Sequence, residues 1–320
     1  MICPSLNELP PAPAGKSGWP WTKESKPITA EMQKKGSLPR ISIITPSFNQ
    51  GEFIEETIRS VLLQGYPDLE YIIIDGGSTD ITVEIIRKYE KWITFWVSEK
   101  DRGQSHAINK GFKKASGVIG NWINSDDLLT KNCLTSITEH LEEPLQKWVY
   151  SGIGIGADRD RLTERRGKSI KKCVESLENL VNIPAYWKNG DSISQQATFF
   201  PVELFSKVGG VSENNHFTMD YELWGKFLLE GATFKKLDIP LGIFRKYPGQ
   251  KISNEYKTRM SLLKSAKELI DKESSWDKQK KAKLKKILSF YRIRYTYGHV
   301  RSIIGIKRRL NSLKSHFLKQ

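Results

Sequence analysis

Hydrophobic positions change their period repeatedly from residue 41 onward. Four apolar runs of strand length are each followed by a polar loop, at residues 41–45, 70–75, 93–98 and 118–123. After the first run, Ile54, Ile58 and Val61 recur with the helical period, and similar segments follow the next two runs. Strands that alternate with helices predict the α/β class, with a doubly wound, mostly parallel sheet and flanking helices.

The pattern is less regular beyond residue 130. Here we expect a helix that ends at Gly231 and a second helix with Pro201 at its first position. The polar span 158–191 is typical of a variable insertion. The expected strands lie at 148–155, 196–200, 233–239 and 241–245, and the expected helix before Gly231 at 220–229.

Composition divides the chain into three parts. Half of the 14 prolines precede Arg40, so residues 1–39 are expected to be extended, with Trp19 and Trp21 laid across the main domain. Residues 40–250 form that domain, and residues 251–320 form a basic helical tail.

The net charge of +15 belongs to the tail alone. Residues 1–250 hold 31 basic and 31 acidic side chains, whereas residues 251–320 hold 20 and 5. A tail of this charge predicts an anionic partner for the tail. The neutral main domain argues against nucleic acid as a ligand of its crevice, since phosphates require clustered Lys and Arg.

Hydropathy and cysteine usage set the expected compartment. The chain is 38% hydrophobic with a mean hydropathy of −0.47, and no apolar run reaches the roughly 18–20 residues of a membrane helix. Its three cysteines have no CxxC spacing, and the amino terminus lacks the pattern of a secretion signal. We therefore expect a cytoplasmic protein.

Polar clusters follow the predicted strands at one edge of the sheet. Thr45, Asp75, the pair Asp101–Arg102 and the pair Asp126–Asp127 each lie at the carboxyl end of a strand or just beyond it. In open α/β sheets ligands bind beyond the carboxyl ends of the strands. These separately encoded groups are therefore expected to converge on one crevice.

Six motifs occur in a fixed order between about residues 40 and 250: TPSFNQGEFIEETIRSVLLQG, IIIDGGSTD, SEKDRGQSHAINKGFKKASG, NSDD, SQQATFF and MDYELW. Together they resemble glycosyltransferase family 2, whose members have the GT-A fold. The resemblance implies an inverting glycosyltransferase that uses a nucleotide-sugar donor.

Asp126 and Asp127 stand where the family holds Mg²⁺ or Mn²⁺ against the donor diphosphate. Adjacent carboxylates at a strand end suit a hard divalent cation. Asn124 replaces an acid that is common in relatives, and is expected beside the donor. One of the two acids could instead cap the next helix.

The resemblance places the donor base between two loops. Asp75 matches an aspartate that recognises uracil, and Thr45, Pro46 and Phe48 match one wall of the pocket, which favours a UDP-sugar. Gly76 stands where relatives often have a second acid. The open alternative for Asp75 is a turn residue that accepts bonds from backbone amides.

Two further positions match donor contacts. Arg102 corresponds to a position near the phosphates, and the alternative is a solvated loop charge. Gln195 and Gln196 correspond to a segment near the donor sugar and the acceptor, with Gln196 expected at the donor. As residues flanking the core, these two glutamines would have no role.

Asp220 matches the family's catalytic base. The helical period places Asp220, Leu223 and Trp224 on one face, so Asp220 is expected to point toward the sheet. Glu222 lies on another face, with Lys226 as a surface partner. The alternative is that Asp220 only caps the helix.

The chemistry implied is a single displacement with inversion, in which Asp220 deprotonates an acceptor hydroxyl. The acceptor would be a glycan or a lipid-linked acceptor in polysaccharide or cell-surface glycan biosynthesis. Two alternatives stay open. A metal-dependent nucleotidyltransferase would need a glycine- and lysine-rich phosphate loop after the first strand, which TPSFNQGEF lacks. A catalytically inactive module would bind only through its tail.

The tail has the pattern of a basic amphipathic helix, which can lie on an anionic lipid leaflet. Residues 255–320 therefore predict peripheral attachment to the inner face of the membrane, while a helix packed on the domain or on a second subunit stays an alternative. Tyr247 stands where relatives often have a histidine, and Arg245 or Lys246 is expected to reach phosphate. The apolar positions of the tail helix are Ile303, Ile306, Leu310, Leu313 and Phe317.

Overall fold

The computed structural model has one sheet, with strand order β3-β2-β1-β4-β8-β6-β9-β5 and with β7 paired to β6. It describes residues 3–28, 38–158, 161–165, 174, 176–184, 193–248, 250 and 254–317. The strands are β1 (Ile41–Ser47), β2 (Leu69–Asp75), β3 (Phe95–Ser98), β4 (Ile119–Trp122), β5 (Leu128–Leu129), β6 (Trp148–Asp158), β7 (Arg161–Arg165), β8 (Thr198–Pro201) and β9 (Thr233–Lys246).

The helices follow the expected alternation with the strands. The main helices are α2 (Ile54–Leu62), α3 (Thr82–Tyr89), α4 (Gln104–Phe112), α5 (Cys133–Thr138), α6 (Leu177–Val181), α8 (Val202–Lys207), α9 (Met219–Leu229), α10 (Glu255–Lys272) and α11 (Lys278–Phe317). Single 3₁₀ turns lie at Leu6–Glu8, Glu90–Trp92, Leu145–Lys147 and Gln195–Ala197.

The first four strands of the chain form the parallel half of the sheet. β1 pairs in parallel with β2 on one side and with β4 on the other, and β2 pairs with β3. Ile41 and Ile43 of β1 lie in one apolar cluster, together with Ile58 of α2 and Ile85 of α3. Ile44 lies in a second cluster across the sheet. Both faces are thus covered, which confirms the expected α/β architecture.

The other half of the sheet mixes strand directions. β8 runs antiparallel to both β4 and β6, and β9 runs parallel to β6. The two strands expected at 233–239 and 241–245 form the single strand β9, with register shifts where it passes Gly152 and Ile153 of β6. Pro201 precedes α8 as its N-cap instead of taking its first position. Most of the polar insertion 158–191 lies outside the described residues.

The amino-terminal segment lies across the domain through its two tryptophans, as expected. The Trp19 indole donates to the Leu129 carbonyl (2.9 Å), and the Trp21 indole donates to Glu56 (3.1 Å). The Arg59 guanidinium stacks on Trp21 at 5.1 Å and donates to the carbonyls of Pro10, Pro20 and Trp21. These bonds attach residues 3–28 to α2.

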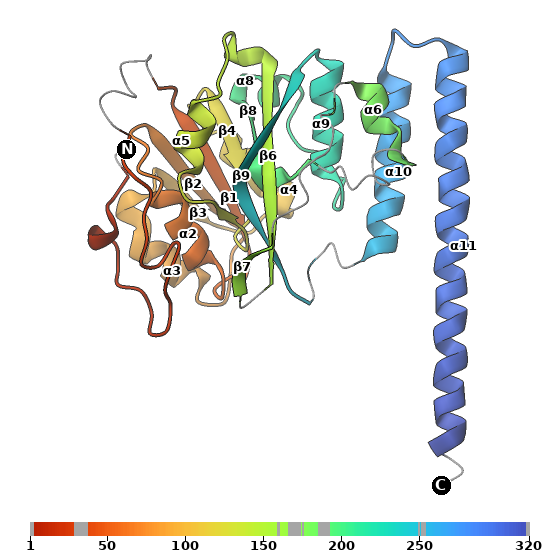
Figure 1. Ribbon diagram of the computed structural model, residues 1–320, viewed down its shortest axis with the longest axis horizontal. Helices are drawn as coiled ribbons and strands as arrows, with labels where there is room; N and C mark the ends of the chain where they lie inside the picture. Colours follow the sequence, from red (N-terminus) through yellow and green to blue (C-terminus); the bar gives the residue numbers. More distant parts are fainter. Residues whose placement is uncertain are drawn as a thin grey trace.

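The tail forms two helices. α10 packs against α9 and α6 through Leu262, Ala266 and Leu269, which are buried. α11 lies beside α10 and extends well past it, away from the sheet (Figure 1). The apolar positions expected from Ile303 to Phe317 lie outside the side chains that the structure describes. Among the described residues, no helix is both long and apolar enough to cross a bilayer.

Candidate active site

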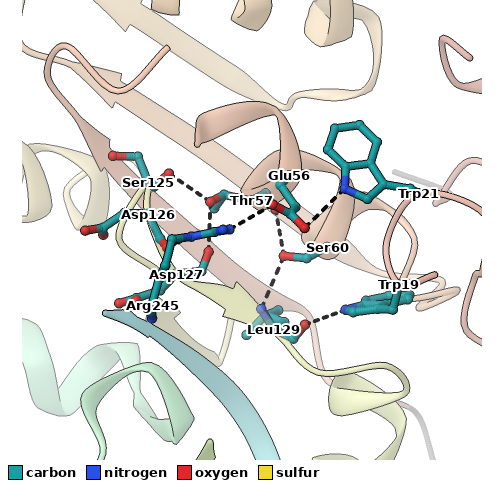
Figure 2. Close-up of polar contacts among 10 residues, drawn as sticks. All are labelled: Trp19, Trp21, Glu56, Thr57, Ser60, Ser125, Asp126, Asp127, Leu129 and Arg245. Atoms are coloured by element: carbon teal, nitrogen blue, oxygen red, sulfur yellow. Dashed lines mark hydrogen bonds and ion pairs between the residues drawn. The ribbon is translucent and has the colours of Figure 1, made fainter. Parts of the chain in front are cut away.

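The site lies at the carboxyl ends of β1, β2 and β4, where the strand order reverses around β1. A turn follows β4 and is closed by a bond from the Asp127 amide to the Asn124 carbonyl (2.9 Å). The Thr57 hydroxyl on α2 donates to the carbonyls of Ser125 (2.9 Å) and Asp127 (2.8 Å) (Figure 2). Helix α2 therefore fixes the backbone of the two acids.

Asp127 is buried, and its carboxylate is held within the protein. Oδ1 accepts the Arg245 amide (3.1 Å), and Oδ2 accepts the side-chain amide of Asn124 (3.1 Å). Burial and then the charge of Asp126 raise the pKa of Asp127 well above its usual range. The exposed fraction of Asp127 is 1%, so this side chain joins β9 to the loop after β4.

Asp126 has a more open position. It is half-buried, and its Oδ2 accepts bonds from the Tyr247 hydroxyl (2.8 Å) and the Gln250 amide (3.3 Å). Its Oδ1 accepts no hydrogen bond from the residues that the structure describes. The tyrosine at the histidine position of relatives thus contacts the acid directly. Of the two acids, Asp126 is the one with ligand capacity left.

Arg245 points into the protein, so of the two residues named for a phosphate contact only Lys246 is exposed. Its guanidinium forms an ion pair with Glu56 (2.9 Å), and the exposed fractions of the two side chains are 4% and 8%. Its Nε donates to the Asp126 carbonyl (2.9 Å). Glu56 also accepts the Trp21 indole, so the amino-terminal segment, α2 and β9 meet behind the two acids (Figure 2).

Asp75 is fully occupied by its own loops. It is buried, and its two oxygens accept bonds from the amides of Gly77 (3.1 Å) and Ser78 (2.9 Å) and from the hydroxyls of Ser78 (2.5 Å) and Ser98 (2.6 Å). A carboxylate offers about four acceptor positions. Asp75 therefore accepts bonds from backbone amides of its own turn, which is the alternative that the sequence left open. A contact with a base would require Asp75 to give up one of these bonds.

Thr45 is also internal. It is fully buried, and its hydroxyl shares a hydrogen bond with the Tyr71 hydroxyl (3.1 Å). Its side chain therefore contributes to the core and offers no surface to a donor, which corrects the expectation of a pocket wall. Pro46 is buried as well, whereas Phe48 is 58% exposed at the end of β1. Phe48 is the member of this set that is open to a planar ligand.

Asp101 occupies the space beside Gly76; the sequence placed it at the crevice but gave it no role of its own. A Cβ on Gly76 would lie 3.0–3.2 Å from the carboxylate atoms of Asp101. The Oδ1 of Asp101 accepts the Gly103 amide (2.7 Å), and the described residues donate no hydrogen bond to its Oδ2. The sequence signal for Asp101 was Gly76, at a position where relatives often have an acid. Without a side chain at position 76, there is room for the acid from the β3–α4 loop.

Arg102 lies on the surface and pairs with Glu213. Nε and Nη2 bond the same carboxylate oxygen, at 3.0 and 2.8 Å. The Arg102 side chain is 69% exposed, so the pair links the β3–α4 loop to the segment before α9. The predicted phosphate contact would have to compete with Glu213.

Asn124 lies at the centre of a chain of amides. Its Oδ1 accepts Gln104 (2.8 Å), and its amide donates to Asp127 and to Gln195 (3.4 Å). Gln195 therefore lies at the site, while Gln196 is 6% exposed and packs where a Cβ on Gly242 would lie. This corrects the expectation for Gln196, because the turn at Gln195–Ala197 directs the first glutamine of the pair toward Asn124.

Asp220 is in the first turn of α9 and is half-buried. Its neighbour Met219 accepts the Ser105 hydroxyl (2.8 Å), and Ser105 follows Gln104, which contacts Asn124. One turn later, Trp224 stacks on Trp122 of β4, with ring centroids 6.0 Å apart. The first turn of α9 and the loop after β4 therefore both contact the start of α4.

Glu222 is not the surface residue that the period predicted. It is 8% exposed, accepts the Asn215 amide (3.0 Å) and lies 3.4 Å from its expected partner Lys226. Packing of α10 on α9 covers this face, since Asn215 also donates to Ser265 (3.0 Å). The second acid of α9 thus holds α9, α10 and the preceding loop together.

The carboxylates of the site fit a divalent cation whose coordination is completed by a bound phosphate ligand. Among the described residues, no three His, Cys, Asp or Glu side chains are grouped to hold a metal alone. Mg²⁺-type sites commonly use one or two carboxylates and complete the shell with phosphate and water. Asp126, with Asp127 behind it, matches that pattern.

Comparisons with known proteins agree with this geometry. Residues 42–187 match the model of glycosyl transferase family 2. An uncharacterized glycosyltransferase of Mycobacterium tuberculosis is 30% identical over 202 residues, which are 61% of this chain and 70% of that protein. TuaG of Bacillus subtilis, named for teichuronic acid biosynthesis, is 36% identical over 145 residues, which are 44% of this chain and 55% of TuaG.

Solved structures show the same fold. The structure of TarS residues 1–349 from S. aureus, in complex with UDP-GlcNAc, matches with a TM-score of 0.60 and 19% identity, over 77% of this chain and 70% of that one. A mannosyltransferase from Pyrobaculum calidifontis, in complex with GDP-Man and Mn²⁺, matches with a TM-score of 0.53 and 19% identity, over 79% and 69%.

The chain belongs to glycosyltransferase family 2 and has a GT-A-like fold. The matched part spans less than two thirds of the length of several of the relatives that it matches, 55% in the case of TuaG.

Proposed function

We propose that the protein transfers a sugar from a nucleotide diphosphate donor to a hydroxyl acceptor with inversion. One observation carries the proposal: the half-buried Asp220 and the acid pair Asp126–Asp127 lie on segments that meet at the start of α4. This arrangement allows separate acids to serve the two ends of the reaction.

Asp220 is the general base in this scheme. It accepts the proton of the acceptor hydroxyl while that oxygen attacks the anomeric carbon, and the bond from that carbon to the diphosphate oxygen breaks. The products are an inverted glycoside, the nucleoside diphosphate and a protonated Asp220. The Tyr221 amide, which donates to Asp220 Oδ1 (2.8 Å), holds the carboxylate in place.

Asp126, with the buried Asp127 behind it, would hold Mg²⁺ or Mn²⁺, and this cation would neutralise the charge of the departing diphosphate. Tyr247 and Gln250 orient Asp126 by binding one of its oxygens, which leaves the other oxygen for the cation. The Mn²⁺ complex of the archaeal mannosyltransferase supports this assignment.

The base of the donor would lie between Phe48 and the Gly76–Asp101 contact. The exposed Phe48 ring offers a face for stacking. The Oδ2 of Asp101 offers an acceptor to a base N–H, such as the N3–H of uracil in a UDP-sugar. The UDP-GlcNAc complex of TarS agrees with this choice.

The acceptor would be a glycan or a lipid-linked acceptor used in making a cell-surface polysaccharide, in line with the name of TuaG. The test is to incubate the full chain with a panel of nucleotide sugars and Mn²⁺. Metal-dependent release of nucleoside diphosphate supports the proposal. Release of pyrophosphate, or of no product with any donor, contradicts it.

A further inference from the structure

An apolar groove runs between α10 and α11, away from the proposed active site. Its volume is about 1040 Å³. Its floor and walls are mainly apolar and aromatic side chains from both helices: Tyr256, Met260, Leu263, Leu288, Ile293 and Tyr297.

The face of α11 beside the groove is exposed to an unusual degree. Phe290, Ile293 and Tyr297 are 61%, 70% and 66% exposed, and they fall within two turns of one helix. Leu284 and Leu288 of the same helix are buried against α10, so the exposed set is a second apolar stripe that the described chain does not cover. Exposed apolar patches of this kind mark interaction sites.

The rim of the groove is cationic. Lys264, Lys267, Lys285 and Arg292 line it. Lys264 and Lys285 pair with Glu268 and Asp271, whereas Lys267 and Arg292 form no ion pair with any residue that the structure describes. The 40 residues of α11 include 13 Lys and Arg and no acidic residue.

We propose that the α10–α11 groove docks the protein on an anionic lipid surface, with hydrocarbon in the groove and lipid phosphate at its rim. Charge argues against a second copy of this chain as the occupant, since α11 offers no carboxylate to another basic helix. The apolar floor argues against nucleic acid, because phosphates bound at the rim would leave the apolar side chains of the floor exposed to water. Anionic lipid matches both parts, since its hydrocarbon can contact the apolar floor and its phosphate can contact the cationic rim.

The groove is also separate from the proposed active site, so lipid could occupy it without blocking the donor. α11 packs on α10, and α10 packs on α9 and α6, so the groove is attached to the enzyme without sharing residues with Asp126 or Asp220. Arg259 stacks on Tyr295 at 4.5 Å, and Tyr256 stacks on His299 at 4.2 Å, which hold the two helices together at the groove. The docking surface is therefore preformed.

The test is co-sedimentation of the full chain with phosphatidylcholine vesicles that contain or lack phosphatidylglycerol. We expect binding only with phosphatidylglycerol, and weaker binding at high salt because the surface potential is screened. Lys267→Gln with Arg292→Gln should weaken binding roughly 25-fold, from the attraction of each cation to the surface. Arg87→Gln with Lys88→Gln, an exposed pair on α3, removes the same charge and should leave binding within about twofold of the parent.

A second double variant tests the apolar side chains of the groove. Ile293→Ser with Tyr297→Ser keeps every charge and should weaken vesicle binding at least about tenfold. Both side chains are largely exposed, so the fold should be preserved, which circular dichroism checks. Equal binding to both kinds of vesicle, unchanged binding of either groove variant, or an equal loss in the α3 control overturns the proposal. Preferred retention on RNA over vesicles overturns it as well.

Docking and catalysis fail separately in this design, because vesicle binding needs no donor. Nucleoside diphosphate release with a water-soluble acceptor should be the same for the parent, both groove variants and the α3 control. An enzyme without donor turnover that still binds vesicles would refute the proposed function and leave the docking surface standing.

Discussion

Replacement of Glu56 by Gln should destabilise the protein and loosen the site behind Asp126. Glu56 forms a buried ion pair with Arg245 (2.9 Å) and accepts the Trp21 indole (3.1 Å). Loss of one partner of a buried pair costs about 3–5 kcal/mol, because the other charge stays buried. Glutamine still accepts one hydrogen bond, so the expected loss is near the lower end, about 3 kcal/mol.

That loss converts to a measurable shift. For a domain of this size, about 3 kcal/mol lowers the melting temperature by about 6–12 °C. Arg245 also binds the Asp126 carbonyl and the Asp127 carboxylate, so Mn²⁺ affinity should fall about 10–100-fold, as for other residues that position metal ligands. Thermal melts and calorimetric Mn²⁺ titration of the protein in the presence of saturating UDP check the two effects.

The control is Glu84→Gln on α3, an exposed residue for which neither effect is expected. Glu56→Leu with Arg245→Met should recover most of the stability, since an apolar pair replaces a buried charge pair at little cost. The reasoning would be refuted by a loss of less than about 1 kcal/mol in Glu56→Gln. Unchanged Mn²⁺ affinity would refute the positioning role alone.

Four further predictions follow from the same geometry. Asp220→Asn should lower kcat by about 10²–10⁴-fold with little change in donor affinity, in steady-state assays of nucleoside diphosphate release. Asp126→Ala should abolish the gain in donor affinity that Mn²⁺ gives, as measured by calorimetry. Asp101→Asn should weaken UDP binding roughly tenfold and leave pyrophosphate binding unchanged, because the charged acceptor for a base N–H is lost. Glu70→Gln should lower stability at neutral pH, and the difference from the parent should disappear once the pH is below the lowered pKa of Glu70 in the folded protein.

The sign for Glu70 follows from its hydrogen bonds. Burial by itself raises its pKa, but bonds donated by Ser42 and Ser116 outweigh burial and lower the pKa. A lowered pKa stabilises the fold above the unfolded value, and this contribution disappears as the pH falls through the folded value. Urea melts between pH 3 and 8 test this, and a difference between parent and variant that persists at the lowest pH contradicts it.

Each of the other variants has a specific contradicting result. Retained turnover in Asp220→Asn would remove the general base, with Glu230→Gln at the exposed end of α9 as the control. A normal Mn²⁺ effect in Asp126→Ala would move the metal elsewhere. A change in UDP and pyrophosphate affinity by the same factor in Asp101→Asn would exclude a contact between Asp101 and the base.

Local pattern was enough to predict the parallel half of the sheet. A continuous apolar run reports a strand buried on both faces, and the helical period reports a helix buried on one face, so β1, β2, β4 and α2 were predicted within a few residues. The carboxyl ends of parallel strands share one edge, so the sequence also predicted that Asp75 and Asp126–Asp127 gather there. The family motifs needed no tertiary information.

Tertiary structure alone decided what each polar side chain does. Asp126 and Asp127 are neighbours in the sequence, yet Asn124 and the Arg245 amide enclose one while Tyr247 binds the other. Arg245 turns inward because Glu56, 189 residues away in sequence, is buried beside it. Hydrogen-bond partners and burial come from distant segments, and a one-dimensional period carries no information about which segments those are.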